Sequence, residues 1–217
     1  ETFDETWENK GRATKWALYA LMAETCLWAE EYQECITYAD YLINATAPIR
    51  PVFMSASGQW FNMFYPGNSN ESIFEINFDV LTYNQPVDYS PSAYFTYSVS
   101  ARLQYSLAML TRLMLENLNS NESSVRAYGG AYNDLGIGAT SSIWKYQGYG
   151  YLSSGYRDQQ DANWILYRMA DVLLMKAEAL VWQGGTANFQ AAIDLINRVR
   201  IRANVTELDV NINDVTE

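Results

Sequence analysis

The chain has 217 residues, 49% of them apolar, which is enough for one domain with a sizeable core. Its formal net charge of -11 would repel phosphate backbones and anionic lipid surfaces, so no nucleic-acid partner is expected. Histidine, the commonest general base and metal ligand, is absent, which argues against many enzyme classes. Aromatic residues make up 15%, with 17 tyrosines and 7 tryptophans, and such side chains suit wet binding surfaces.

Two helices are predicted near the start of the chain, over residues 11–46. Apolar residues recur at helical spacing between Arg12 and Ala29, and again after the polar break at Glu30 and Glu31. The apolar face of the first helix consists of Trp16, Tyr19, Ala20, Ala23, Cys26 and Leu27. That of the second consists of Tyr32, Cys35, Ile36, Ala39, Leu42 and Ile43. This pattern predicts a helical hairpin. It places Cys26 and Cys35 on facing helices, where either a disulfide or two small buried core residues would fit.

Residues 50–162 are predicted to form a long irregular insertion, because glycine, serine, asparagine and tyrosine accumulate there. Three short elements are expected within it. The alternation from Ile73 to Phe78 predicts a half-buried strand, with Phe74, Ile76 and Phe78 on one side and Glu75 and Asn77 on the other. Leu103, Leu107, Leu110 and Met114 predict a helix, and Ile143–Tyr146 a small strand. Long irregular insertions on helical frames usually carry function.

A second hairpin is predicted over residues 163–203. Its first helix would bury Leu166, Met169, Ala170, Leu173, Ala177 and Leu180 and end at Gly184 and Gly185. Its second helix carries Phe189, Ala192, Ile193, Ile196 and Val199, which match Tyr32, Cys35, Ile36, Ala39 and Leu42 in order and type. Tetratricopeptide-like repeats typically show this pattern: an aromatic residue, a small residue three positions later, and then a large apolar residue at each helical turn. The expected fold class is therefore mainly α, with tetratricopeptide-like hairpins and a loop insertion that contains short β-strands, in a single domain over residues 1–217.

Several segments resemble the SusD/RagB family of nutrient-binding outer-membrane lipoproteins. They are Arg12, Thr14 and Lys15 with the run Ala17–Ala23, the segment Asn70–Ile76, and the ordered pair Tyr167–Ala179 and Ala192–Arg200. The resemblance spans nearly the whole chain, which would be less than half of a usual member. It implies that the lipid-modified cysteine, the first helices and a C-terminal motif lie outside this sequence.

The resemblance also implies a function and a location. It implies non-catalytic binding of oligosaccharides or polysaccharide fragments at the cell surface, and delivery to a TonB-dependent transporter of the SusC type. The protein would sit on the extracellular face of the outer membrane and touch the membrane only through a lipid anchor. No run of about 18 apolar residues is present, so no membrane span is predicted. No cofactor is expected.

The insertion supplies candidate glycan contacts. Sugar rings present a face of C–H groups, so a binder needs exposed aromatic planes with amides, carboxylates or guanidinium groups nearby. We predict the stacking contacts and the amide among Tyr83, Asn84, Tyr89, Tyr94 and Tyr97, with Trp60 as a further ring. The alternative is a purely structural role, in which these rings pack under the loops and contact no ligand.

Two other functions stay open. A tetratricopeptide-like scaffold could bind a peptide or protein segment in a groove between its helices. A hydrolase could use paired carboxylates, for which Glu71 and Glu75 are the nearest candidates, although a structural role explains them better. Asp158 and Asp161 could bind calcium, but no loop repeats oxygen ligands at the required spacing, so no metal site is predicted.

Overall fold

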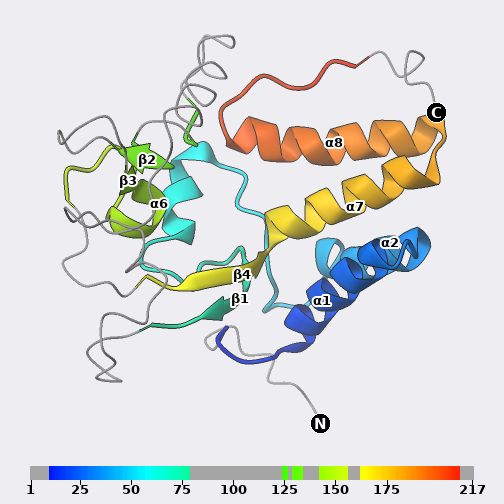
Figure 1. The fold of residues 1–217 in the computed structure, drawn as a ribbon, viewed down its shortest axis with the longest axis horizontal. Helices are drawn as coiled ribbons and strands as arrows, with labels where there is room; N and C mark the ends of the chain where they lie inside the picture. The colour runs from blue at the N-terminus through cyan, green and yellow to red at the C-terminus, as the bar shows by residue number, and fades with distance from the viewer. Residues whose placement is uncertain (1–9, 79–123, 127–128, 134–141, 156–161, 211–217) are drawn as a thin grey trace.

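The computed structural model describes residues 10–78, 124–126, 129–133, 142–155 and 162–210. Four helices fill one end of the molecule: α1 (Lys15–Trp28), α2 (Tyr32–Ile43), α7 (Met169–Gln183) and α8 (Thr186–Arg202) (Figure 1). A short 3-10 helix (Ser57–Met63), β2 (Tyr132–Asn133), β3 (Ser142–Ile143) and α6 (Trp144–Gln147) lie at the other end, and β1 (Ser72–Ile76) with β4 (Trp164–Arg168) lies between. The mainly α fold class predicted from the sequence is confirmed.

The first hairpin begins at Thr14, whose hydroxyl accepts a hydrogen bond from the backbone N–H of Ala17 at 3.2 Å. This contact satisfies one of the orphan donors at the start of α1. Ala20 and Ala23 are fully buried on α1, and Cys35 and Ala39 are fully buried on α2. Because these side chains are small, the two helices can approach closely, as the repeat pattern requires.

The second hairpin begins where β4 ends. The carboxylate of Asp171 accepts the backbone N–H of Arg168 at 3.1 Å, which caps the start of α7. Gly184 and Gly185 separate α7 from α8 with φ angles of 73° and 91°, a region that non-glycine residues rarely adopt. Leu166 was expected on this helix, and that prediction was wrong: it lies on β4, because Trp164–Arg168 pairs with β1 as an extended strand.

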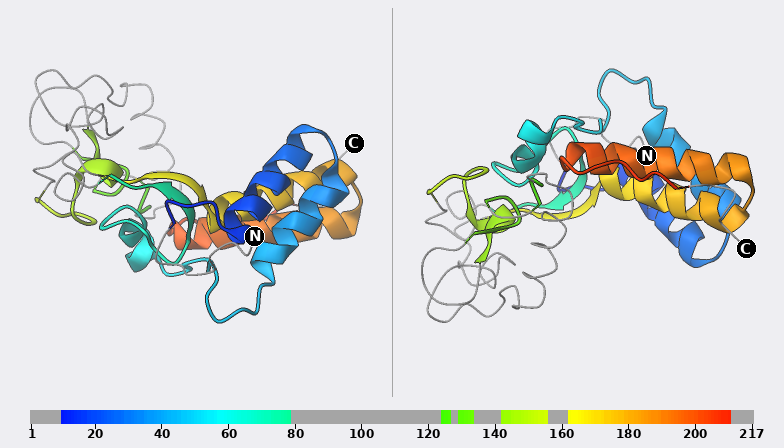
Figure 2. Two further views of the ribbon diagram at one scale, coloured as in Figure 1. Left: turned by 90° about the horizontal axis from the view of Figure 1, so that it is seen from below. Right: turned by 90° about the horizontal axis from the view of Figure 1, so that it is seen from above.

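The helices pack in the order α1, α2, α7, α8, so that α2 joins hairpins from opposite sides of the insertion (Figures 1 and 2). Their shared core consists of Ala23, Cys35, Ile36, Leu173, Ala177, Ala179, Leu180, Ala192 and Leu195. Within the described ranges, none of the helices has the length and apolar character needed to cross a bilayer. The division of the chain into 11–46, 50–162 and 163–203 stays a prediction.

The β1–β4 ribbon is antiparallel and interrupted by register shifts on either side of Phe74. The predicted alternation along β1 was wrong. Ile73 and Glu75 are fully buried, whereas Ile76 is among the exposed large apolar residues. The reason is that Glu75 finds buried partners: its carboxylate accepts the backbone N–H of Asn68 and the side-chain amide of Asn163 at 2.8 Å. A carboxylate satisfied in this way can occupy the inner face of a strand.

The described part of the insertion has an aromatic core of its own. Trp144 is fully buried, and Tyr146 stacks on Trp164 with ring centroids 5.3 Å apart. The predicted strand Ile143–Tyr146 was wrong in extent, because only Ser142–Ile143 is extended and the chain then turns into α6. The helix predicted from Leu103 to Met114 lies outside the described residues.

Candidate functional site

Most of the predicted glycan contacts cannot be placed in the fold. Tyr83, Asn84, Tyr89, Tyr94 and Tyr97 lie outside the described residues, so their role stays a prediction. Asp158 and Asp161, considered for calcium, also lie outside them.

Trp60 is part of the insertion core. Its ring packs edge-on against Phe61 and Phe64, with centroids 6.2 and 5.0 Å away, and its side chain is only 5% exposed. An open stacking platform needs a free ring face, and Trp60 offers only a small part of its surface. The burial of Trp60 agrees with the structural alternative, in which the ring packs beneath the loops. A contact between Trp60 and a ligand stays a prediction.

A different group of rings lies at the turn ends of the two hairpins, and these ends of the helices are at the right of Figure 1. Tyr32, at the start of α2, stacks on Trp182, near the end of α7, with ring centroids 6.0 Å apart and planes only 8° from parallel. Trp28, at the end of α1, lines a surface cavity together with these two residues. Trp28 is 82% exposed and Trp182 is 64% exposed. We call Trp28, Tyr32 and Trp182 the turn platform.

Carboxylates surround the turn platform. Glu24, Glu30 and Glu178 line the same cavity of about 310 Å³, together with Leu27 and Met175. Burial, followed by the negative charges of Glu30 and Glu178, raises the pKa of the Tyr32 hydroxyl. The site therefore combines flat apolar faces with strong hydrogen-bond acceptors, which is the combination that a polyhydroxylated ring requires.

The sequence contained a signal for the turn platform that the periodicity argument passed over. Trp28 stands two residues before the break at Glu30, and Trp182 stands two residues before the break at Gly184. Both fall outside the helical positions expected to be buried. Tryptophan at the exposed end of a helix, repeated in two hairpins, is a candidate binding residue because burial does not account for it.

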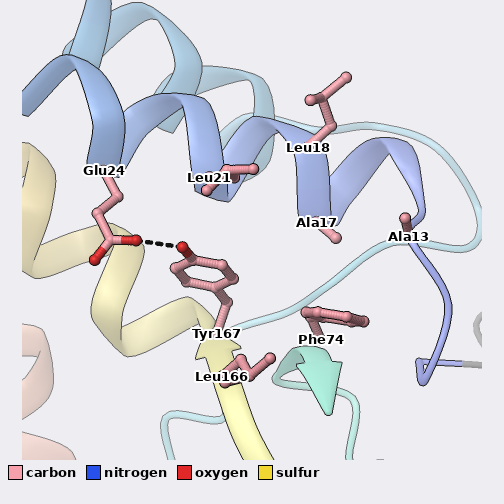
Figure 3. A pocket seen from close by; sticks show the side chains of 8 residues that line it. All are labelled: Ala13, Ala17, Leu18, Leu21, Glu24, Phe74, Leu166 and Tyr167. Atoms are coloured by element: carbon pink, nitrogen blue, oxygen red, sulfur yellow. Dashed lines mark hydrogen bonds between the residues drawn. The ribbon is translucent and has the colours of Figure 1, made fainter. Parts of the chain in front are cut away.

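A larger cavity, of about 540 Å³, lies between α1 and the β1–β4 ribbon (Figure 3). Ala13, Ala17, Leu18, Leu21, Phe74 and Leu166 line it with Tyr167 and Glu24. The Tyr167 hydroxyl donates a hydrogen bond to Glu24 at one end, as the dashed line shows. Burial, the hydrogen bond to Glu24 and the charge of Glu24 raise the pKa of Tyr167 to about 12. With so few polar groups, this groove lacks the partners that sugar hydroxyls need.

Comparison with known proteins identifies the family. The family model described as SusD family matches residues 92–216, more than half of the chain. This chain belongs to the SusD family.

Solved SusD structures share the fold. A SusD homologue from Bacteroides thetaiotaomicron superposes with a TM-score of 0.70 at 23% identity, covering 96% of this chain and 47% of that one. A SusD-superfamily protein from Bacteroides vulgatus gives 0.68 at 20% identity, covering 89% and 41%. A second Bacteroides vulgatus structure, named as a candidate sugar-binding protein, gives 0.67 at 22% identity, covering 94% and 42%. The chain spans less than half the length of these SusD structures. A search of curated proteins found no match.

The carboxylates considered for hydrolysis are structural in this SusD chain. Glu71 and Glu75 are fully buried. Glu71 accepts hydrogen bonds from Arg202 and from the backbone N–H groups of Met54 and Ala170. A catalytic carboxylate pair must flank a substrate, whereas neither of these residues lines any of the cavities described here.

The two cysteines are free thiols, so the disulfide that the sequence left open is not formed. Cys35 is fully buried in the hairpin core. Burial, together with the neighbouring Cys26 and Glu178, raises the pKa of Cys35 to about 11. Among the residues that the structure describes, no group of three or more acidic or cysteine side chains could hold a metal ion.

Proposed function

We propose that this protein binds oligosaccharides without transforming them, and that the turn platform contributes a binding surface. The observation that carries the proposal is the parallel stack of Tyr32 and Trp182 beside the exposed Trp28. Membership of the SusD family and the sugar-binding name of one structural relative support the ligand class.

The geometry suits a sugar ring in two ways. The C–H face of the ring can lie on the tryptophan planes, which cost little side-chain entropy because they are rigid. The hydroxyl groups around the ring can donate to the carboxylates of Glu30 and Glu178 at the edge of the cavity. At about 310 Å³, the cavity is at the lower end of the usual range for ligand sites, about 300–1,000 Å³. It would hold a short part of a longer chain.

The insertion would supply a second contact surface. We keep Tyr83, Asn84, Tyr89, Tyr94 and Tyr97 as the proposed contacts there, with Trp60 as a further ring. Two surfaces on one chain would favour long glycans over short ones, because the second contact of a bound glycan forms within the complex.

Family membership supports the wider biological role. We infer that the protein acts on the extracellular face of the outer membrane, held by a lipid anchor, and passes its glycan to a TonB-dependent transporter of the SusC type. The buried, fully engaged carboxylates Glu71 and Glu75 support binding rather than hydrolysis.

Calorimetric titration with a panel of neutral oligosaccharides of two to eight sugar units tests the proposal. We expect at least one glycan to bind. Trp182→Ala should weaken that binding by about tenfold, since a base or ring stacked on an aromatic side chain contributes about 1–3 kcal/mol. Tyr41→Ala is the matched control, because Tyr41 is an exposed aromatic residue on α2 that does not line the platform cavity.

The alternative of a peptide-binding scaffold also places its contacts on the helices, so the class of ligand distinguishes the two functions. A peptide array screened beside the glycan panel provides this comparison. If peptides bind and no glycan of the panel does, the protein is a peptide-binding scaffold and the glycan-binding proposal is wrong.

A further inference from the structure

A cavity of about 340 Å³ lies where the insertion meets the second hairpin, and its largely apolar wall carries several basic side chains. The cationic residues that line it are Arg126, Lys145, Arg168 and Arg202. Trp60 and Phe64 form the aromatic part of the wall, and none of the described residues that line it is an aspartate or glutamate. It is separate from the turn platform.

The positive charge of these lining residues is opposite in sign to the net charge of the chain. The protein has 25 acidic and 14 basic residues, whereas the described residues that line this cavity include four basic side chains and no acidic one. At physiological ionic strength charges are screened beyond about 8 Å. A ligand inside the cavity would therefore feel the nearby cations more strongly than the net charge of -11.

Two of the cations are held by carboxylates behind the wall. Arg202 pairs with the buried Glu71 at 2.5 Å. Arg168 lies 3.7 Å from Asp171 at the start of α7. These pairs fix the positions of the two guanidinium groups and leave them on the cavity wall.

Lys145 is different, because none of the described carboxylates forms an ion pair with it. Its amine lies 5.6 Å from the ring centre of Phe64 and 5.2 Å from that of Tyr146. Burial, and then the positive charge of Arg168, lower the pKa of Lys145, and the negative charge of Asp171 offsets part of this effect. Ring faces attract the ammonium group but do not neutralise it. The amine thus lies on the cavity wall near the charge of Asp171, but it forms no ion pair with a carboxylate in the part of the chain that the structure describes.

We propose that this cavity receives the negatively charged substituent of an acidic sugar, a carboxylate or a sulfate, with Lys145 as its main partner. The sugar ring would contact the small accessible parts of Trp60 and Phe64 on the wall, and Arg126 would face the same anion. The inference rests on the proposed glycan-binding function and adds to it a preference for glycans that carry an acidic sugar beside neutral ones. Hydrogen bonds between charged groups are about twice as strong as neutral ones, so charge should dominate the choice of ligand.

Titration of the full chain with an oligogalacturonate and with its fully methyl-esterified form tests the inference. The two ligands share a backbone and differ in charge. We expect the charged form to bind about tenfold more tightly, with the difference shrinking at high salt. A sulfated chondroitin disaccharide, run in parallel, distinguishes sulfate from carboxylate as the preferred anion.

Variants of Lys145 locate the effect. Lys145→Met keeps the apolar stem over the two rings and should remove most of the preference for the charged ligand, whereas Lys145→Arg should retain it. Lys15→Met is the matched control, because Lys15 also lies over an aromatic ring, 4.7 Å from that of Trp16, but does not line this cavity. Thermal unfolding of each variant verifies that the fold is retained.

The results separate the two proposals. If the wild type binds neutral glycans but shows no preference for the charged oligogalacturonate over its esterified form, this inference is overturned and the glycan-binding function is left intact. An unchanged preference in Lys145→Met would also overturn it. A blank for every glycan would overturn both.

Discussion

Arg202, in the last turn of α8, donates from Nη1 to both carboxylate oxygens of Glu71, at 2.6 and 2.5 Å. The two side chains are 2% and 0% exposed, and they join the end of the second hairpin to the start of β1. Met54 and Ala170 donate backbone N–H groups to the same carboxylate. One buried acid thus ties together the insertion, the ribbon and two helices.

Removing one partner of this pair should destabilise the fold strongly. Glu71→Gln leaves the charge of Arg202 buried, and such a change costs about 3–5 kcal/mol. Urea unfolding followed by circular dichroism would measure the loss. Lys176→Met provides the matched control: Lys176 pairs with Asp40 at 2.6 Å in a more exposed place, where ion pairs contribute about 0–1 kcal/mol. Equal losses in the two variants would contradict the role given to Glu71.

The turn platform should depend on ring faces more than on the Tyr32 hydroxyl. Tyr32→Phe preserves the stack with Trp182, so we expect glycan affinity to change by less than about threefold, whereas Tyr32→Ala should cost about tenfold. Calorimetry with the best ligand of the neutral panel measures both. A larger loss in Tyr32→Phe than in Tyr32→Ala would show that stacking is not the source of affinity.

The two thiols should differ in reactivity. Cys35 is fully buried with a pKa of about 11, so almost no reactive thiolate forms near pH 8. Cys26 is only half-buried, although its pKa is also raised, first by burial. We expect iodoacetamide to label Cys26 slowly and Cys35 only after unfolding, as peptide mass spectrometry would reveal. Denatured, unreduced protein should titrate with two thiols, and a smaller number would indicate a disulfide.

Tyr167 should make stability depend on alkaline pH. Its pKa is raised from 10.0 to about 12 by burial and by Glu24, so the folded state favours the protonated hydroxyl. The resulting stabilisation is fully present below pH 10 and is lost as the pH rises through 12. Unfolding of wild type and Tyr167→Phe from pH 8 to pH 12 tests this. The wild type should lose its advantage over the variant across that window, and a constant difference would contradict the assignment.

The helices were predictable because their signals are local. Small residues at fixed spacing, such as Ala39 and Ala192, and the glycine pair at Gly184 mark the hairpins without knowledge of the tertiary fold. The ribbon was harder, because Glu75 is buried by Asn163, a partner far along the chain that no window around β1 contains. Leu166 was misplaced for a related reason, since pairing with β1 overrides its helical spacing.

The candidate site shows the same limit. Trp60, Trp28 and Trp182 are the same residue type in the sequence, yet Trp60 is buried and the other two are exposed. That outcome depends on which elements pack together, as when α2 and α7 bring Tyr32 to Trp182. The basic cavity could not be foreseen either, because its four cations come from separate segments.

The direct packing of α2 on α7 fixes both ends of the long insertion near one another. The entropic cost of closing a loop grows only slowly with its length, by about 0.6 kcal/mol per doubling. Evolution can therefore lengthen, shorten or rewrite the residues between the hairpins at little expense to folding. A new surface between the hairpins thus needs no new scaffold, only new sequence in the part of the chain that the helices already hold at both ends.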